Sequence, residues 1–355
     1  MISSKNHLVI MAGGVGSRFW PMSTPDFPKQ FIDILGCGKT LIQLTAERFK
    51  EICLPENMWV VTSVKYKEVV KEQLPWLDEH HILCEPCRRN TAPCIAYASW
   101  KIKQINPNAN MIVTPSDHIV MNVQEFQRVI QSALKFTNGL DSIVTLGMKP
   151  TRPETGYGYI EADLSYPSPV NKEVYRVFSF KEKPDLKTAE RYVKNKSYFW
   201  NSGIFIWNVH TVVNALRVYQ PAMAEVFESL TPYYFKENEQ EKVNELFPTC
   251  DNISIDYAVM ENADEIFVLP ADFGWSDLGT WKSLRENVGS TDIWGNMILG
   301  KNVKMFESKN CIVHALDERK VIIQGLEDYI VVEKDHQLLI CKISDEQRIK
   351  EFSAE

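Results

Sequence analysis

Short apolar runs alternate with segments of helical periodicity over the first 147 residues, and this alternation restricts the fold more than any other feature of the sequence. The first run, at residues 7–12, meets a group of glycines, as a buried strand that enters a tight loop does. Strands that alternate with helices of about 10–15 residues form a mostly parallel sheet with helices on both faces. We therefore expect strands at residues 7–12, 58–62, 81–84, 110–115 and 142–147, with helices at 40–52, 66–74, 91–105 and 124–136.

The rest of the chain follows two further patterns. Between residues 157 and 269 the order is mixed, with strands expected at 157–162, 174–180, 204–207 and 265–269 and helices at 186–194, 210–230 and 239–247. After residue 287, short apolar runs recur roughly every 8–10 residues, and turn-like segments separate most of them. These runs, at 303–305, 311–314, 321–324, 329–332 and 338–341, predict a small β-helix-like region, followed by a polar helix at 345–352. We therefore expect an α/β domain over residues 1–285 and a C-terminal β domain over residues 286–355.

The charge balance limits the classes of partner. The 355 residues include 39 Lys and Arg against 46 Asp and Glu, which gives a net charge of −7. A general nucleic-acid binder normally carries a basic excess, so nucleic acid is not an expected partner. A small polyanionic substrate is still compatible, because a few well-placed cations can serve a pocket.

No segment indicates membrane insertion or export. The longest apolar runs fall far short of the ~20 residues that a spanning helix needs. Residues 1–7 lack the basic and then apolar layout of a signal peptide and lead directly into the first expected strand. A cytoplasmic protein without a membrane partner is therefore expected. Its eight cysteines are expected to be reduced, since Cys84 and Cys87 have zinc-knuckle spacing but no second ligand pair follows.

Two common phosphate motifs fail on single residues. The dinucleotide fingerprint would need a glycine three residues after Gly16, where the chain has Phe19. The residues 38–40 resemble the end of a Walker A loop, but that motif needs a glycine where the chain has Asp33.

A different glycine loop remains after the first strand. Gly13, Gly14 and Gly16 let backbone N–H groups approach phosphate oxygens without interference from side chains. Arg18 adds a fixed fork of donors, and Lys29 adds a point charge. Ligands bind beyond the carboxyl ends of the strands in such sheets, which is where this loop is expected. The loop therefore predicts a site for a phosphorylated ligand.

The signature around this loop resembles a known family. Residues 13–21 (GGVGSRFWP) followed by residues 28–31 (PKQF) are similar to the signature of the sugar-nucleotide pyrophosphorylases, in the version found in mannose-1-phosphate guanylyltransferases. Further matches follow in the family's order, at residues 89–93, 115–118, 156–160, 180–184, 200–205, 254–257 and 274–281. The resemblance implies a Rossmann-like nucleotidyltransferase fold of class α/β, with a mixed, mostly parallel sheet.

The resemblance also implies a reaction. A sugar-1-phosphate oxygen attacks the α-phosphorus of a nucleoside triphosphate, and pyrophosphate leaves. The protein must position two polyanions and offset their charge. Catalytic roles are implied for Arg18 and Lys29 on the triphosphate and for Asp117 and Asp277 as ligands of Mg²⁺, which binds one or two carboxylates and keeps its other positions for phosphates and water. No general base is required, because the second pKa of the attacking phosphate is ~6.

The binding residues implied by the resemblance form two groups. The nucleotide group comprises Gly13, Gly14, Gly16, Asn90, Thr91, Pro93 and Ser116. The sugar-phosphate group comprises Gly158, Glu182, Lys183, Asn201 and Asp256, with Lys183 on the phosphate and Asp256 on the sugar or the metal.

Transfer of GMP from GTP to mannose 1-phosphate, giving GDP-mannose and pyrophosphate, is the main hypothesis. A related enzyme with a different base or sugar is the nearest alternative. A regulatory homologue that binds sugar nucleotides without turnover is another, although such a protein is expected to lose Arg18, Lys29 or one aspartate, and this chain keeps them. A monofunctional enzyme is expected, since about 70 residues after position 285 are too few for a fused isomerase domain. By resemblance, the β region contributes to a homodimer.

Overall fold

The computed structural model describes residues 2–288, 290–316 and 319–354 and divides the chain into two compact units. Unit 1 consists of residues 1–13, 46–115 and 121–275, and unit 2 consists of residues 14–45, 116–120 and 276–355. The boundary expected at residue 286 divides the chain into two continuous segments. The two compact units are instead groups of residues that contact one another, and each contains several segments. This grouping places residues 14–45 in the same unit as the C-terminal strands.

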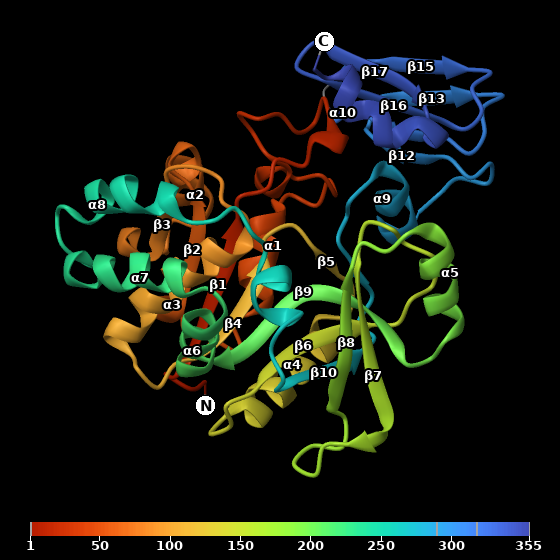
Figure 1. The fold of residues 1–355 in the computed structure, drawn as a ribbon. Coiled ribbons are helices and arrows are strands. Elements are labelled where there is room, and N and C mark those ends of the chain that lie inside the picture. Colours follow the sequence, from red (N-terminus) through yellow and green to blue (C-terminus); the bar gives the residue numbers. More distant parts are fainter. Residues whose placement is uncertain (1, 289, 317–318, 355) are drawn as a thin grey trace. The chain divides into compact units, whose positions relative to one another are not determined.

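Unit 1 is built on a nine-stranded mixed sheet in the order β3-β2-β1-β4-β9-β6-β10-β8-β7 (Figure 1). Strands β1, β2, β3 and β4 pair in parallel, as do β6 and β10, whereas β9 is antiparallel to both β4 and β6. The predicted α/β sheet is therefore confirmed. Its strands are β1 (Asn6–Ala12), β2 (Met58–Ser63), β3 (Ile82–Glu85), β4 (Asn110–Pro115), β6 (Ile143–Met148), β7 (Gly158–Pro167), β8 (Tyr175–Glu182), β9 (Tyr198–Asn208) and β10 (Ile266–Ala271).

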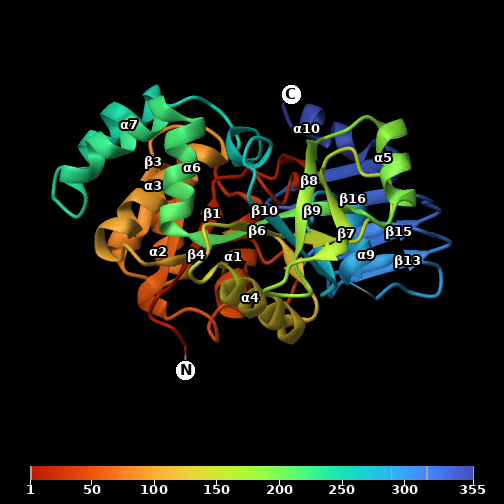
Figure 2. The same ribbon diagram turned by 60° about the horizontal axis from the view of Figure 1, so that its bottom comes forward.

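Helices cover both faces of this sheet (Figure 2). On one face α3 packs against β1, β2 and β3, and α6 packs against α3, α7 and β9, whereas α4 packs against β6, β9 and β10. None of the helices among the described residues is long and apolar enough to cross a membrane. The helices are α2 (Lys67–Gln73), α3 (Thr91–Ile105), α4 (Val123–Thr137), α5 (Leu186–Lys194), α6 (Val209–Tyr219), α7 (Pro221–Leu230) and α8 (Glu239–Leu246).

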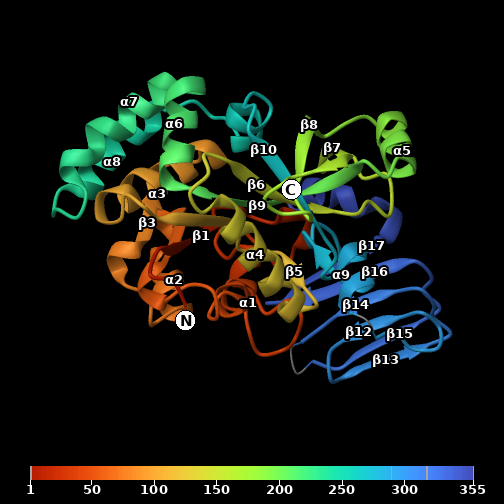
Figure 3. The ribbon, with the colours of Figure 1, turned by 90° about the horizontal axis from the view of Figure 1, so that it is seen from below.

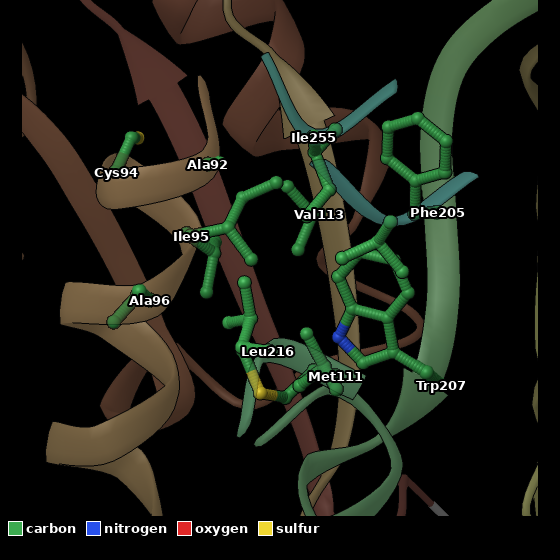
Figure 4. Close-up of a cluster of buried hydrophobic side chains, with 14 of the residues drawn as sticks. Ala92, Cys94, Ile95, Ala96, Met111, Val113, Phe205, Trp207, Leu216 and Ile255 are labelled. Atoms are coloured by element: carbon green, nitrogen blue, oxygen red, sulfur yellow. The ribbon is translucent and has the colours of Figure 1, made fainter. Parts of the chain in front are cut away.

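The strands alternate their side chains between the two faces, as a pleated strand must. Val268 belongs to the apolar cluster beneath α3 and α6, while its neighbour Phe267 contacts Phe136 of α4 with ring centroids 5.1 Å apart. Figure 4 shows part of this cluster, to which α3, β4, α6 and β9 contribute Ile95, Met111, Leu216 and Trp207. Burial on both faces explains why the parallel strands read as continuous apolar runs in the sequence.

Several expected elements differ in extent, such as the helix expected at 40–52, which ends at Arg48, and the strand expected at 157–162, which runs to Pro167. The helix expected at residues 210–230 is two helices, because the ring of Pro221 cannot continue α6, and Pro is favourable at the first position of α7. The strand expected at 204–207 begins earlier, at Tyr198, and pairs along its length with β4, β6 and β7.

Unit 2 contains short C-terminal strands in stacked rungs (Figure 3). Strands β12, β14 and β16 pair in parallel, β13 pairs in parallel with β15, and β17 closes the stack antiparallel to β16. The expected polar helix begins as a 3₁₀ turn, η9 (Ile343–Arg348), before α10 (Ile349–Phe352). The other elements are η1 (Ser17–Phe19), η2 (Lys29–Phe31), β5 (Ile119–Val120), α9 (Trp281–Val288), β12 (Met297–Leu299), β13 (Val303–Phe306), β14 (Ile312–His314), β15 (Val321–Gln324), β16 (Tyr329–Lys334) and β17 (Gln337–Lys342), while α1 (Leu41–Arg48) and β11 (Trp275–Ser276) run across the unit boundaries.

The glycine-loop segment and the C-terminal strands share one hydrophobic core. Phe19 of the segment lies 4.9 Å from Trp281 of α9, measured between ring centroids, and both side chains are fully buried. The same cluster includes Ile34, Ile330 and Ile349 from three distant parts of the chain. Packing therefore fixes the conformation of the signature segment against residues that follow it by about 300 positions.

Candidate active site

A pocket of about 320 Å³ in unit 2 brings the four predicted catalytic residues together. Arg18 and Lys29 come from the glycine-loop segment, Asp117 follows β4, and Asp277 precedes α9. All of these residues belong to unit 2. The full lining comprises Gly16, Ser17, Arg18, Phe19, Lys29, Asp117, His118, Asp277, Gly279 and Lys350.

The ammonium of Lys29 is buried and held by three acceptors. It lies 2.8 Å from Oδ2 of Asp117, and it donates to the carbonyl oxygens of Asp277 at 3.1 Å and Leu278 at 2.8 Å. An ammonium has three N–H donors, so each has a protein acceptor here. Lys29 thus connects the Asp117 carboxylate to the turn that carries Asp277. A direct bond to phosphate, as the sequence predicts, would require one of these acceptors to be released.

The carboxylate of Asp117 is kept ionised by its neighbours. Burial alone would raise its pKa, but Lys29 and then His118 hold the pKa below its ordinary value. Asp277 lies on the same pocket, where its Oδ1 accepts a hydrogen bond from the N–H of Gly279 at 3.0 Å. Two carboxylates on one pocket fit Mg²⁺, which leaves its other positions for water and phosphate. No cluster of three or more His, Cys, Asp or Glu that could hold a metal occurs in the described ranges, so any Mg²⁺ here would depend on such outside ligands.

The glycine loop is held through its carbonyl groups and not through its N–H groups. The carbonyl oxygens of Gly14, Val15 and Gly16 accept hydrogen bonds from Gln30 Nε2, the Lys29 N–H and a serine hydroxyl, respectively. The N–H groups of the same residues donate to no acceptor within the part of the chain that the structure describes. A loop fixed through its carbonyl groups, with its donors left over, is suited to a phosphate.

Gly16 is required by the packing of this loop. Its φ of +68° lies in the left-handed region, and a Cβ there would stand 2.6 Å from Cβ of Lys29. Gly14 has nothing within 4 Å of the place where a Cβ would stand, so the two glycines serve different purposes.

The predicted sugar-phosphate residues come together in unit 1. Nδ2 of Asn201 donates to Oδ1 of Asp256 at 2.9 Å, and Nζ of Lys183 lies 3.0 Å from Oε1 of Glu182. Gly158 faces Glu182 across the β7–β8 pair, and a Cβ on Gly158 would collide with that carboxylate. The chain therefore places a cation, two acids and an amide in one group, which suits a phosphorylated sugar.

The acids of this group influence each other. Burial raises the pKa of Asp256 to about 6, and the nearby charge of Glu182 acts in the same direction. Asn201 is fixed from behind, because its Oδ1 accepts from the hydroxyl of Thr145 at 3.1 Å. Thr145 is thus a positioning residue that the motifs did not indicate.

The predicted nucleotide residues are divided between the units. Asn90 caps α3 in unit 1, where its side chain accepts from the N–H of Thr91 at 2.9 Å, and Pro93 is buried in the first turn. Thr91 Oγ1 accepts from the N–H of Ile255 at 2.9 Å and so ties α3 to the segment before Asp256. Ser116 is buried in unit 2, and its carbonyl oxygen accepts from the hydroxyl of Thr45.

A buried glutamate beside Gly13 in unit 1 was missed by the sequence motifs. Glu85 ends β3, is 7% exposed, and has an Oε1 with no hydrogen-bond partner among the described residues. Its Oε2 lies 3.7 Å from where a Cβ on Gly13 would stand. Burial raises the pKa of Glu85 to about 8, which Arg88 partly opposes. The sequence did indicate a charged residue at the carboxyl end of an apolar strand. Glu85 lies between Cys84 and Cys87, and this segment was considered only for its zinc-knuckle spacing. All eight cysteines are free.

Comparison with known proteins gives consistent findings. The family model described as nucleotidyl transferase matches residues 7–291. The mannose-1-phosphate guanylyltransferase of Escherichia coli is 34% identical over 347 residues, which cover 96% of this chain and 74% of that protein. The alginate biosynthesis protein AlgA of Pseudomonas syringae pv. tomato is 35% identical over 351 residues, covering 98% of this chain and 71% of that protein.

A solved structure agrees over almost the whole chain. It is a protein from Thermus thermophilus described as a mannose-1-phosphate geranyltransferase, with 30% identity and a TM-score of 0.87, and the match covers 99% of this chain and 98% of that one. The shared fold, the matched signature segments and the pocket of Arg18, Asp117 and Asp277 lead to one conclusion: the chain belongs to the nucleotidyl transferase family, in the branch of the mannose-1-phosphate guanylyltransferases.

Proposed function

We propose that the protein transfers GMP from GTP to mannose 1-phosphate and so forms GDP-mannose and pyrophosphate. The observation that carries this proposal is the unit 2 pocket, where a loop with unpaired N–H groups meets Arg18 and the two carboxylates of Asp117 and Asp277. Those groups suit a triphosphate with a divalent cation. The names of the E. coli and Thermus thermophilus relatives support mannose 1-phosphate as the second substrate.

The residues of unit 2 bind the triphosphate and stabilise the charge that moves onto the departing pyrophosphate. The guanidinium of Arg18 presents a planar fork of donors and has no ion-pair partner among the residues that the structure describes. Asp117 and Asp277 would hold Mg²⁺, which neutralises phosphate charge when bound. Lys29 keeps the Asp117 carboxylate and the Asp277 turn in fixed positions, so that little reorganisation accompanies the reaction.

The residues of unit 1 bind the attacking substrate. Lys183 is the cation for the sugar phosphate, while Glu182 and Asp256 accept hydrogen bonds from sugar hydroxyls and Asn201 orients Asp256. The attacking phosphate oxygen is already ionised near neutral pH, since its second pKa is ~6, so no residue has to remove a proton.

Guanine is favoured over the other bases by the chemistry of Glu85. When ionised, a carboxylate accepts two adjacent hydrogen bonds, and the N1–H and N2–H groups of guanine are an adjacent pair of donors. Because burial raises the pKa of Glu85 to about 8, guanine would bind the form of Glu85 that has released its proton. Adenine and cytosine present a ring-nitrogen acceptor at that edge, and the N3–H of uracil lies between two carbonyl acceptors. The unpartnered Oε1 of Glu85 beside Gly13 thus favours GTP over the alternative of another nucleotide.

The test is pyrophosphate release by the purified full chain with Mg²⁺, using each of GTP, ATP, UTP and dTTP against mannose 1-phosphate and glucose 1-phosphate. Release with GTP and mannose 1-phosphate at a kcat/KM at least tenfold above every other pair supports the proposal. A higher value for another pair would replace the assigned substrates. Binding of GDP-mannose without release from any pair would instead support the regulatory homologue.

We further propose that the protein acts as a homodimer in the cytoplasm. Support comes from the resemblance alone, in which the C-terminal β region contributes to dimers. Light scattering coupled to gel filtration measures the mass directly. A mass near that of the 40.9 kDa chain at micromolar concentration would contradict the dimer.

A further inference from the structure

A lysine from the C-terminal end of the chain lines the same pocket as the glycine loop. Lys350 lies in α10, more than 70 positions after Asp277, and borders the pocket with Arg18, Asp117 and Asp277. No family motif noted in the sequence extends this far, and the helix is only four residues long. The position of Lys350 therefore depends on how α10 is held.

Packing holds α10 directly against the glycine-loop segment. Ile349, the residue before Lys350, is fully buried in the core that contains Phe19 of η1. The preceding turn is fixed to α9, where Oε2 of Glu346 accepts from the N–H of Lys282 at 3.0 Å. Ile349 thus anchors α10 in the core, and its exposed neighbour Lys350 lines the pocket.

The cations of this helix and of the pocket differ in whether they have acidic partners. Arg348 has an acidic partner, with Nε 3.4 Å from Oε2 of Glu351, and its guanidinium also contacts the ring of Phe352. Lys350 forms no ion pair with any residue in the described ranges, and the same holds for Arg18 on the other side of the pocket. Lys29, the third cation of the pocket, already has three acceptors. The cations that remain available for an anionic ligand are therefore Arg18 and Lys350.

We propose that the ammonium of Lys350 binds the terminal phosphates of the nucleoside triphosphate and the pyrophosphate that leaves, so that α10 completes the triphosphate site. This inference rests on the proposed function for the identity of the ligand. A lysine is suited to this task because its flexible four-carbon chain can follow the phosphates as they separate from the α-phosphorus. One ammonium donates a hydrogen bond to the phosphate and also carries a positive charge, which a neutral donor lacks.

The first experiment measures binding of inorganic pyrophosphate by calorimetry to the full chain and to Lys350→Ala, Lys350→Arg and Lys342→Ala. Lys342 is an exposed lysine at the end of β17 that does not line the pocket, so it is the matched control. Lys350→Ala should weaken pyrophosphate about tenfold, the effect of one charged hydrogen bond. Lys350→Arg should retain most of the affinity, and Lys342→Ala all of it. Unchanged affinity in Lys350→Ala, or equal losses in both alanine variants, would overturn the proposal.

Steady-state kinetics separate this inference from the proposed function. Lys350→Ala should raise the KM for GTP about tenfold and leave the KM for mannose 1-phosphate unchanged. A KM for mannose 1-phosphate that rises instead would contradict the assignment to the triphosphate. If the wild-type protein binds pyrophosphate through Lys350 but releases none from GTP, the proposed function fails while this inference stands. Equal thermal midpoints for the variants and the wild type confirm that the folds are comparable.

Discussion

The ammonium of Lys29 lies 2.8 Å from the carboxylate of Asp117, although the two residues are 88 positions apart in the sequence and each belongs to a different signature segment. The same ammonium donates to the carbonyl oxygens of Asp277 and Leu278. One buried lysine therefore joins the carboxylate of Asp117 to the backbone of the turn that carries Asp277, the second residue that would bind Mg²⁺. Its arrangement makes Lys29 a positioning residue in this structure, in addition to any contact with phosphate.

Replacing Lys29 by methionine should destabilise unit 2 and nearly abolish activity. The substitution removes this donor from the Asp117 carboxylate, whose side chain is 28% exposed, and from two carbonyl oxygens, which costs about 2–3 kcal/mol. Thermal unfolding and pyrophosphate release check both effects, with Lys304→Met at an exposed position of β13 as the control. A double variant with Asp117→Asn should regain part of the stability but not the activity. Wild-type stability in Lys29→Met would show that the pair contributes nothing.

The two glycines of the loop should respond differently to alanine. Gly16→Ala places a Cβ against Lys29 at a positive φ, so we expect a loss of about 1–3 kcal/mol in stability together with lower activity. Gly14→Ala meets nothing within 4 Å and should keep the wild-type thermal midpoint, while its KM for GTP rises if phosphate approaches the N–H groups. Equal midpoints for the two variants would contradict the packing argument.

Asp277→Asn should lower Mg²⁺-dependent turnover by about two orders of magnitude or more without unfolding the protein, because an amide is a weak and uncharged ligand for Mg²⁺. EDTA should abolish wild-type turnover, and added Mg²⁺ should restore it. Asp335→Asn, in the exposed turn before β17, is the matched control. Near-normal rates for Asp277→Asn would remove this residue from the metal site.

Glu85→Gln should reduce the preference for GTP about tenfold or more, since the amide offers only one acceptor to the two donors of guanine. The exposed Glu56 provides the control, as Glu56→Gln.

The same Glu85→Gln variant should be more stable than the wild type at alkaline pH when no nucleotide is bound. The pKa of Glu85 is raised to about 8 by burial, so the folded state binds the extra proton between pH 4.5 and 8, and stability falls as the pH rises through that window. At pH 8.5, Glu85→Gln should therefore unfold at a higher temperature than the wild type, and a lower temperature would refute this reasoning.

Two buried histidines should make the protein sensitive to acid. Burial lowers the pKa of His7, with a further contribution from His81, and burial lowers that of His314, in each case from 6.5 to about 4. The unfolded chain then binds more protons below pH 6.5, so stability is lost as the pH falls toward 4, on the order of 2 kcal/mol per histidine at pH 5.

Matched variants remove the titration but keep the hydrogen bonds. His7→Asn retains an acceptor for the Trp59 indole N–H, and His314→Gln retains a donor for the carbonyl oxygen of Ile34. Thermal midpoints measured at pH 7 and pH 5 should differ less in each variant than in the wild type. An unchanged pH dependence in both variants would contradict the assignment.

Much of the α/β unit could be predicted from local pattern. The helices at 91–105 and 186–194 and the strand at 110–115 begin and end where the periodicity, caps and turn residues place them. The signature segments also indicated residues that the structure brings together, such as Asn201 and Asp256, which join through a 2.9 Å hydrogen bond. Residues from separate motifs that bind one ligand must lie close together in the folded protein. The motifs therefore indicate some tertiary contacts as well as local structure.

Other features depend on distant contacts that no local pattern contains. The strand β12 was missed because three residues carry too little periodicity. The first half of the polar helix expected at 345–352 is a 3₁₀ turn and the second half is α10. Glu85 and Lys350 gave only weak signals, since a lone charged residue is usually solvated. Their environments come from the strand edge beside Gly13 and from the packing of Ile349 against Phe19.

The sequence by itself determined the strand and helix order of unit 1, the phosphate loop and the family, because these depend on short-range periodicity and on contiguous motifs. The tertiary structure decided which charges act as partners. It gave Lys29 its three acceptors, left Lys350 and Arg18 without ion pairs in the described residues, and buried Glu85 with an unpartnered oxygen. The physical reason is that hydrogen bonding and desolvation depend on what surrounds a side chain in space. For this protein, those surroundings come from segments as far apart as Phe19 and Ile349.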